Sequence, residues 1–166
     1  MIETDFAAPR QAVWEIVTMP GNRPGWQGSD SVVETVAKGR RRAGTQNHCM
    51  HGKEAIVEEI LDWRPYDYVT FTTLLPVPDA PKVLMGFAFE ERDDGGTHFE
   101  VRFAKPKPKD APFLERIWPD VQARFAKRHE LLRGVLAEQA KAQPDLDEPS
   151  PPVSRDRFLT QPVHAR

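Results

Sequence analysis

Polar residues that could do chemistry gather in one segment of the sequence, on both sides of the pair Gly52-Lys53. This pair suits a two-residue turn between antiparallel strands, and such a turn fixes which residues face one another. Asn47 then faces Glu58. Because adjacent residues of a strand point to opposite faces, one of Glu58 and Glu59 points toward the interior. A carboxylate there would need a hydrogen-bond partner or a raised pKa. The alternatives are a carboxylate at a wet rim of the sheet and a bulge that turns both outward.

Two histidines and the single cysteine lie in the same segment, but their spacing does not favour a metal site. His48 and His51 are three residues apart, which puts them on opposite faces of a strand. Cys49 and His51 share a face, yet two ligands do not make a metal site. Nothing in the sequence marks Cys49 as an activated thiol, so a buried, inert cysteine is the simplest interpretation. We therefore predict no metal and no other cofactor.

A further polar candidate, His129, interrupts an apolar stripe near the C-terminal end. The stripe continues at helical spacing through Phe125, Leu132 and Leu136. The histidine either faces an internal pocket or lies at the edge of the stripe, where water or a strand carbonyl would satisfy it. Together with Glu58 in one pocket, it could act as an acid–base pair.

These residues must be positioned by strands and helices. Strand-like patterns follow one another with short turns and no helix between them, which predicts an antiparallel meander. They cover 31–38, 43–51, 54–62, 67–75, 82–91 and 97–104. A short strand at 2–6, a helix that starts near Pro9 and a helical turn around Trp26 precede them. A long amphipathic helix over 111–142, with a kink or a new start at Pro119, is expected to cover one face of the sheet.

Composition limits the class of protein. The length of 166 residues fits one domain, which we assign to 1–143, followed by a Pro-rich disordered tail or linker at 144–166. A net charge of −2 does not indicate a nucleic-acid partner. No apolar run could span a membrane, and the acidic N-terminus does not predict a signal peptide. With a single cysteine, these features favour a cytoplasmic location.

The order of elements and several short motifs resemble the START/Bet v 1-like superfamily, often called SRPBCC. The motifs are Ala8-Pro9-Arg10-Gln11-Ala12-Val13-Trp14, Pro24-Gly25-Trp26 and the hairpin at His51-Gly52-Lys53. The resemblance covers residues 2–140. It implies an α+β helix-grip fold, in which a curved antiparallel sheet surrounds a long C-terminal helix and two short N-terminal helices. Segment 49–70 also resembles SRPBCC domains that accompany nucleotide cyclase domains.

The resemblance implies a pocket between sheet and helix, and resembling pockets favour the face of Glu58 rather than that of Glu59. A strongly curved sheet cannot touch a straight helix along its whole length, and binding cavities are typically apolar with a few polar groups. We therefore expect a pocket whose lining is apolar apart from a few polar residues. It comprises Asn47, Glu58, Phe71, Thr73, Met85, Phe87, Val101, Phe125 and His129.

Three functions agree with this sequence. The first is binding of a small, largely apolar molecule of lipid, polyketide or aromatic type, as a carrier or sensor. The second is a polyketide cyclase or dehydratase that uses Glu58 and His129. The third is a regulatory domain that contacts a protein partner, such as a nucleotide cyclase, through its C-terminal tail. The fold alone does not decide among them.

Overall fold

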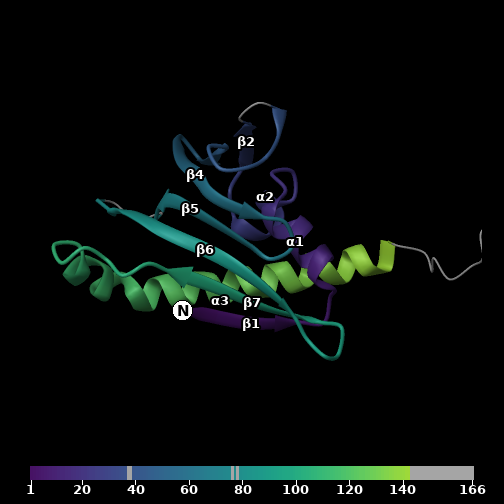
Figure 1. Cartoon of the computed structure of the whole chain (residues 1–166). Coiled ribbons are helices and arrows are strands. Elements are labelled where there is room, and N and C mark those ends of the chain that lie inside the picture. Colours follow the sequence, from purple (N-terminus) through teal and green to yellow (C-terminus); the bar gives the residue numbers. More distant parts are fainter. Residues whose placement is uncertain (37–38, 76, 78, 143–166) are drawn as a thin grey trace, which may run out of the picture.

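The computed structural model describes residues 1–36, 39–75, 77 and 79–142, and it shows the expected α+β architecture (Figure 1). The elements, in chain order, are β1 (Ile2–Phe6), α1 (Arg10–Thr18), α2 (Arg23–Gln27), β2 (Ser31–Thr35), β3 (Gln46–His51), β4 (Glu54–Arg64), β5 (Tyr68–Leu74), β6 (Lys82–Glu91), β7 (Thr97–Phe103) and α3 (Ala111–Ala142). The expected tail at 144–166 lies outside the described residues.

All neighbouring strands pair antiparallel, in the order β1-β7-β6-β5-β4-β3-β2. The predicted meander is therefore confirmed, with β1 added beside β7. Trp14 of α1 packs on Phe89, and Trp26 of α2 packs on Phe87, so both short helices lie on the inner face of the sheet. Trp26 also donates a hydrogen bond from Nε1 to the carbonyl of Ile16 at 3.1 Å, which ties α2 to α1.

The β3–β4 hairpin has the register that the Gly-Lys turn predicts. Gly52 adopts a left-handed φ of 64°, which a residue with a Cβ adopts only at a cost. Asn47 pairs with Glu58 across the hairpin. Glu58 is buried and Glu59 is half-buried on the other face. The choice of Glu58 as the inward carboxylate is therefore confirmed. The register shifts between Ile60 and Asp62, and β4 continues beyond this irregularity to Arg64.

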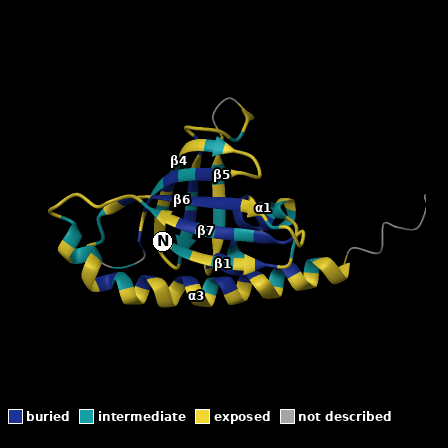
Figure 2. Cartoon of the chain, turned by 60° about the horizontal axis from the view of Figure 1, so that its bottom comes forward, coloured by how far each residue is buried: buried dark blue, intermediate teal, exposed yellow. Residues whose placement is uncertain are grey.

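Helix α3 packs against the sheet, as predicted: Trp118 and Phe125 contact Phe103 of β7, and His129 contacts Phe6 of β1. It is continuous from Ala111 to Ala142 and contains Pro119, so the alternative of a new helix start at this proline is wrong. One stripe of the helix is buried, half-buried residues flank it, and the opposite side is exposed (Figure 2). The stripe comprises Ile117, Val121, Phe125, His129, Leu132 and Leu136.

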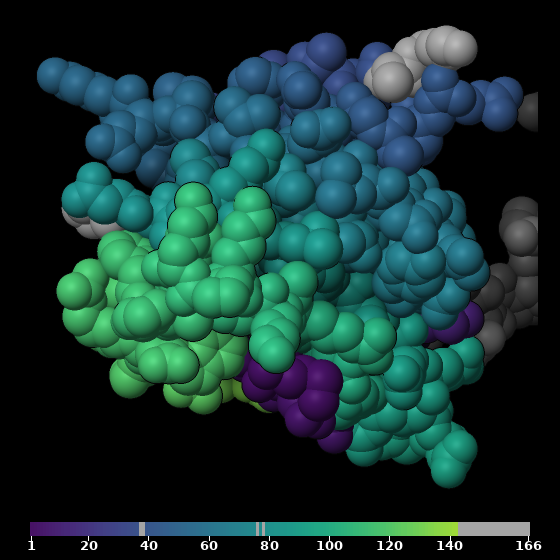
Figure 3. Space-filling model, turned by 60° about the vertical axis from the view of Figure 1, so that its left-hand side comes forward, coloured from purple at the N-terminus to yellow at the C-terminus, as the bar shows by residue number. Residues whose placement is uncertain are grey.

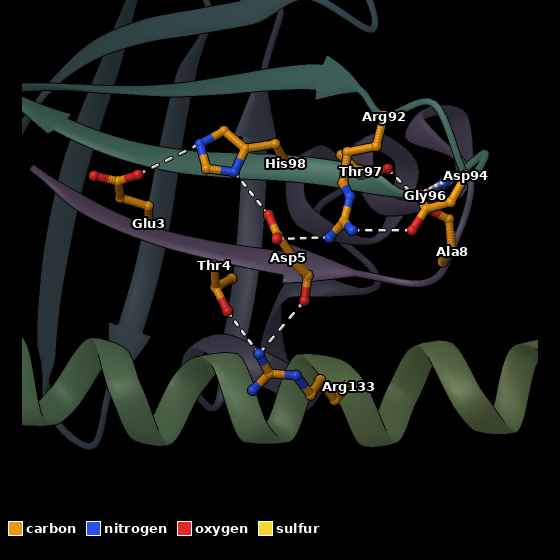
Figure 4. A network of polar contacts seen from close by, with 10 residues as sticks. All are labelled: Glu3, Thr4, Asp5, Ala8, Arg92, Asp94, Gly96, Thr97, His98 and Arg133. Atoms are coloured by element: carbon orange, nitrogen blue, oxygen red, sulfur yellow. Dashed lines mark hydrogen bonds and ion pairs between the residues drawn. The ribbon is translucent and has the colours of Figure 1, made fainter.

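A polar network on the outer strands helps to hold α3 in place (Figure 4). Arg133 of α3 donates to Thr4 Oγ1 at 2.6 Å and to the backbone carbonyl of Asp5 at 3.4 Å. The carboxylate of Asp5 contacts His98 at 2.7 Å and Arg92 at 2.6 Å. The hydrogen bond to Asp5 raises the pKa of His98 above its usual value. This network connects the helix to β1 and β7, away from the Asn47–Glu58 pair.

Candidate functional site

The site is built around a buried ion pair between Glu58 of β4 and Arg23 of α2. Arg23 Nη2 lies 2.6 Å from Glu58 Oε2, and each side chain is 4% exposed. Arg23 also donates from Nε to Gln27 Oε1 at 2.9 Å, one helical turn further along α2. Burial opposes the charge of Arg23, but the charge and hydrogen bond of Glu58, together with smaller effects of nearby groups, raise the pKa of the guanidinium above its usual value. The carboxylate that the sequence placed inside therefore has a cationic partner.

Further cations lie beside this pair, on α3. Arg124 and Arg128 are one helical turn apart and line the same cavity as Glu58. Arg124 is exposed, whereas Arg128 is half-buried and its guanidinium carbon lies 5.3 Å from the centre of the Phe125 ring. Burial lowers the pKa of Arg128, the charge of Glu58 partly opposes this, and the charges of Arg124 and Arg23 add to the lowering. The site is thus richer in cations than in carboxylates.

Cys49 lies on the same sheet face as Asn47 and Glu58 and is 1% exposed. Burial raises the pKa of its thiol to about 11, and the charge of Arg23 only partly opposes this. A thiol with this pKa is protonated at neutral pH and is a poor nucleophile. The geometry agrees with the interpretation of Cys49 as an inert, buried cysteine.

Two small cavities adjoin the ion pair, and Glu58 lines both. The first has a volume of about 30 Å³ and lies between β3–β6 and α3, with Cys49, Met85 and Phe125 in its wall. The second has a volume of about 20 Å³ and lies under α1 and α2, with Arg23 and Asn47 in its wall. Spaces of this size hold little more than a water molecule. In this conformation, side chains fill most of the space between sheet and helix.

The structure brings most of the predicted site residues together around these two cavities. Thr73, Met85 and Phe125 line the first, and Asn47, Phe71 and Phe87 line the second. Among the described residues, Asn47 Oδ1 is buried without a hydrogen-bond partner. Val101, which is fully buried, lines neither cavity. It belongs to the packed core in this conformation.

His129 lies apart from Glu58. It packs edge-on against the rings of Phe6 and Phe99, at centroid distances of 6.2 and 5.7 Å, and it lines neither cavity. Its Nε2 is buried without a partner in the described part of the chain. Burial lowers the pKa of His129 to about 4. No contact joins the proposed acid–base pair among the described residues.

Sequence reasoning missed Arg23, Gln27, Arg124 and Arg128. Arg23 is 35 positions from Glu58, and no periodic pattern connects a five-residue helix with a strand so far along the chain. One signal was available: Arg124 and Arg128 follow Val121 and Phe125 by three residues each, at the edge of the apolar stripe of the helix.

Comparisons with known proteins address the fold. Protein MLL2253 from Mesorhizobium loti superposes with a TM-score of 0.65 at 16% identity, over 82% of this chain and 95% of that one. DynU16, a protein of the dynemicin biosynthetic locus, gives a TM-score of 0.63 at 18% identity, over 82% of this chain and 46% of DynU16. CalU16 from Micromonospora echinospora gives 0.57 at 20% identity, over 78% of this chain and 68% of CalU16. No family model and no curated protein sequence matches.

The chain has a helix-grip fold, which it shares with these solved structures. At these identities the likeness extends to the helix-grip fold alone and identifies no ligand or reaction. None of the helices in the described part of this helix-grip protein combines the length and apolar character that crossing a membrane requires.

Proposed function

We propose that this protein binds a small, largely apolar molecule between the sheet and α3, as a carrier or sensor. The observation that carries this proposal is the buried pair of Arg23 and Glu58, set among apolar side chains. Beside it lies Asn47 Oδ1, which has no hydrogen-bond partner among the described residues. A buried ion pair contributes little net stability, since the cost of desolvating two charges offsets their attraction. Polar groups that interrupt an apolar lining are suited to orienting a ligand.

Ligand entry requires side chains to move, because the two cavities are small. Met85 lies in the wall of the first cavity, and methionine adapts its shape more easily than branched or aromatic residues do. Leu74 and Leu75 line the same cavity, and Leu74 is 42% exposed. We infer that the ligand enters past these leucines and occupies space that Met85 now fills.

The ion pair also suggests how occupancy could be sensed. Helix α2 is only five residues long, and Arg23 joins it to β4 through Glu58. A ligand that contacts Glu58 or Asn47 would strengthen or weaken the ion pair between Arg23 and Glu58 and so shift α2. A ligand shifts a protein from one conformation to another only if it binds the two conformations with different affinities.

The enzymatic alternative is a polyketide cyclase or dehydratase. Its support is the fold shared with DynU16, which comes from a biosynthetic locus. It would require His129 to leave its aromatic neighbours and reach the site of Glu58, so we favour binding. The third function, contact with a protein partner through residues 144–166, falls outside the described residues.

Binding can be tested with the neutral fluorescent probe N-phenylnaphthylamine. We expect saturable binding at one site in the wild type, and at least about tenfold weaker binding, or about 1.4 kcal/mol, in Met85→Trp. The matched control is Leu84→Trp, because Leu84 is the next residue on β6 and is 38% exposed, whereas Met85 is 5% exposed. Equal affinities in both variants, or no saturable binding in the wild type, would contradict the proposal.

A further inference from the structure

The residues that line the first cavity, together with the ion-pair partner of Glu58, carry more positive than negative charge. Arg23, Arg124 and Arg128 surround one carboxylate, that of Glu58. Arg23 satisfies Glu58 directly at 2.6 Å. Glu58 also acts on Arg128 through its charge, but one carboxylate does not balance three cations.

Two other cations of the same helix do have an acidic partner. Arg133 pairs with Glu130 at 2.6 Å, and Lys141 pairs with Glu138 at 2.8 Å. Among the described residues, Arg124 and Arg128 form no ion pair, and Arg128 is half-buried over the ring of Phe125. A partly buried charge without a counterion is unfavourable, and an anion that binds beside it removes this cost.

We propose that the ligand of this site is an amphipathic acid, which has an apolar body and one anionic group that Arg128 and Arg124 bind. This inference rests on the proposed function and adds the chemical class of the ligand. Guanidinium groups present paired N–H donors that match a carboxylate or sulfonate. The apolar body of the ligand lies against Ile56, Met85 and Phe125, which line the same cavity.

Two probes with the same aromatic skeleton separate the charge from the apolar body. Anilinonaphthalene sulfonate carries one sulfonate, and N-phenylnaphthylamine is its uncharged counterpart. We expect the wild type to bind the sulfonate about tenfold or more tightly than the neutral probe, as is usual for a charge-assisted contact. Arg128→Gln should bring the ratio of the two affinities close to one, whereas Arg128→Lys should retain part of the preference.

Lys127→Gln is the matched control, because it removes the same charge from the adjacent residue of α3, which is exposed and does not line the cavity. It should leave the affinities for both probes unchanged. A preference for the sulfonate that survives Arg128→Gln, or that falls equally in Lys127→Gln, would overturn the inference while binding of the neutral probe still supports the proposed function. Absence of saturable binding of both probes to the wild type would overturn the proposed function and this inference with it.

Discussion

At the residue scale, the account depends on Glu58 and the residues that surround it. The position of Glu58 opposite Asn47 was predictable, because a two-residue turn fixes the register of a hairpin. The pairing of Glu58 with Arg23 was not predictable, because a contact between α2 and β4 depends on how the chain folds back over the sheet. The expectation that an inward carboxylate needs a partner was sound, but the sequence did not show which cation supplies it.

The first prediction concerns this ion pair. Glu58→Leu leaves the charge of Arg23 buried without a partner, and Arg23→Met does the same to Glu58. Each single variant should lower the free energy of unfolding by about 3–5 kcal/mol. The double variant should lie closer to the wild type than either single variant, since no unpaired charge remains. Urea denaturation of the four proteins measures this coupling, and additive losses would contradict it.

The second prediction concerns His129, whose pKa burial lowers from 6.5 to about 4. Between these values the unfolded chain binds a proton that the folded protein does not, so stability is lost as the pH falls from 6.5 toward 4. His129→Phe suits the neighbouring rings of Phe6 and Phe99 and removes this effect. The loss of stability from pH 7 to pH 4.5, measured in urea, should be about 2–3 kcal/mol smaller in the variant. An equal loss in both proteins would show that His129 is not the group responsible.

At the element scale, the strands and the long helix were predictable from turn residues and periodicity. Their ends were less so: the strand expected from 43 starts at Gln46, because Thr45 donates its backbone N–H to the carbonyl of Arg42 in a turn. The strand expected to end at 62 continues to Arg64 after the irregularity between Ile60 and Asp62. Local hydrogen bonds and a bulge determine where these strands start and end, and the alternation of apolar and polar residues does not reveal them.

The third prediction tests the turn that positions Glu58. Gly52→Ala places a Cβ on a residue with a φ of 64°, so the free energy of unfolding should fall by about 1–2 kcal/mol. Gly21→Ala is the control, because a Cβ there meets no atom within 4 Å and the residue has no left-handed φ. Urea denaturation should show a change within about 0.5 kcal/mol for Gly21→Ala. Equal effects at both glycines would mean that the Gly52 turn does not require its conformation.

At the scale of the whole molecule, the helix-grip fold could be predicted from the order of the elements. The size of the internal space could not, because it depends on how side chains of opposite walls interdigitate. The inward alternation of Met85 and Phe87 was predictable, whereas the remaining volumes of about 30 and 20 Å³ reflect packing in three dimensions. The structure also contains an outer groove of about 810 Å³ between α1 and the end of α3, bordered by Ala8, Ala12 and Ala140.

The fourth prediction concerns the C-terminal segment. Residues 146–166 are rich in proline and charged residues and contain few large apolar side chains, so deleting them should leave the thermal midpoint nearly unchanged. Thermal unfolding of the full chain and the truncated chain compares them directly. A loss of more than about 2 kcal/mol would show that this segment packs on the domain.

The central claim is that a ligand binds between the sheet and α3, beside the pair of Arg23 and Glu58. Amide chemical shifts, followed while the protein is titrated with N-phenylnaphthylamine, test the location most directly. The account predicts saturable shifts centred on Cys49, Met85 and Phe125, which line the cavity beside this pair. On the face of the molecule seen in Figure 3, the start of α3 (green) lies against segments coloured teal and blue. Shifts centred instead on the outer groove beside Ala140, or no saturable shifts, would contradict binding between the sheet and α3.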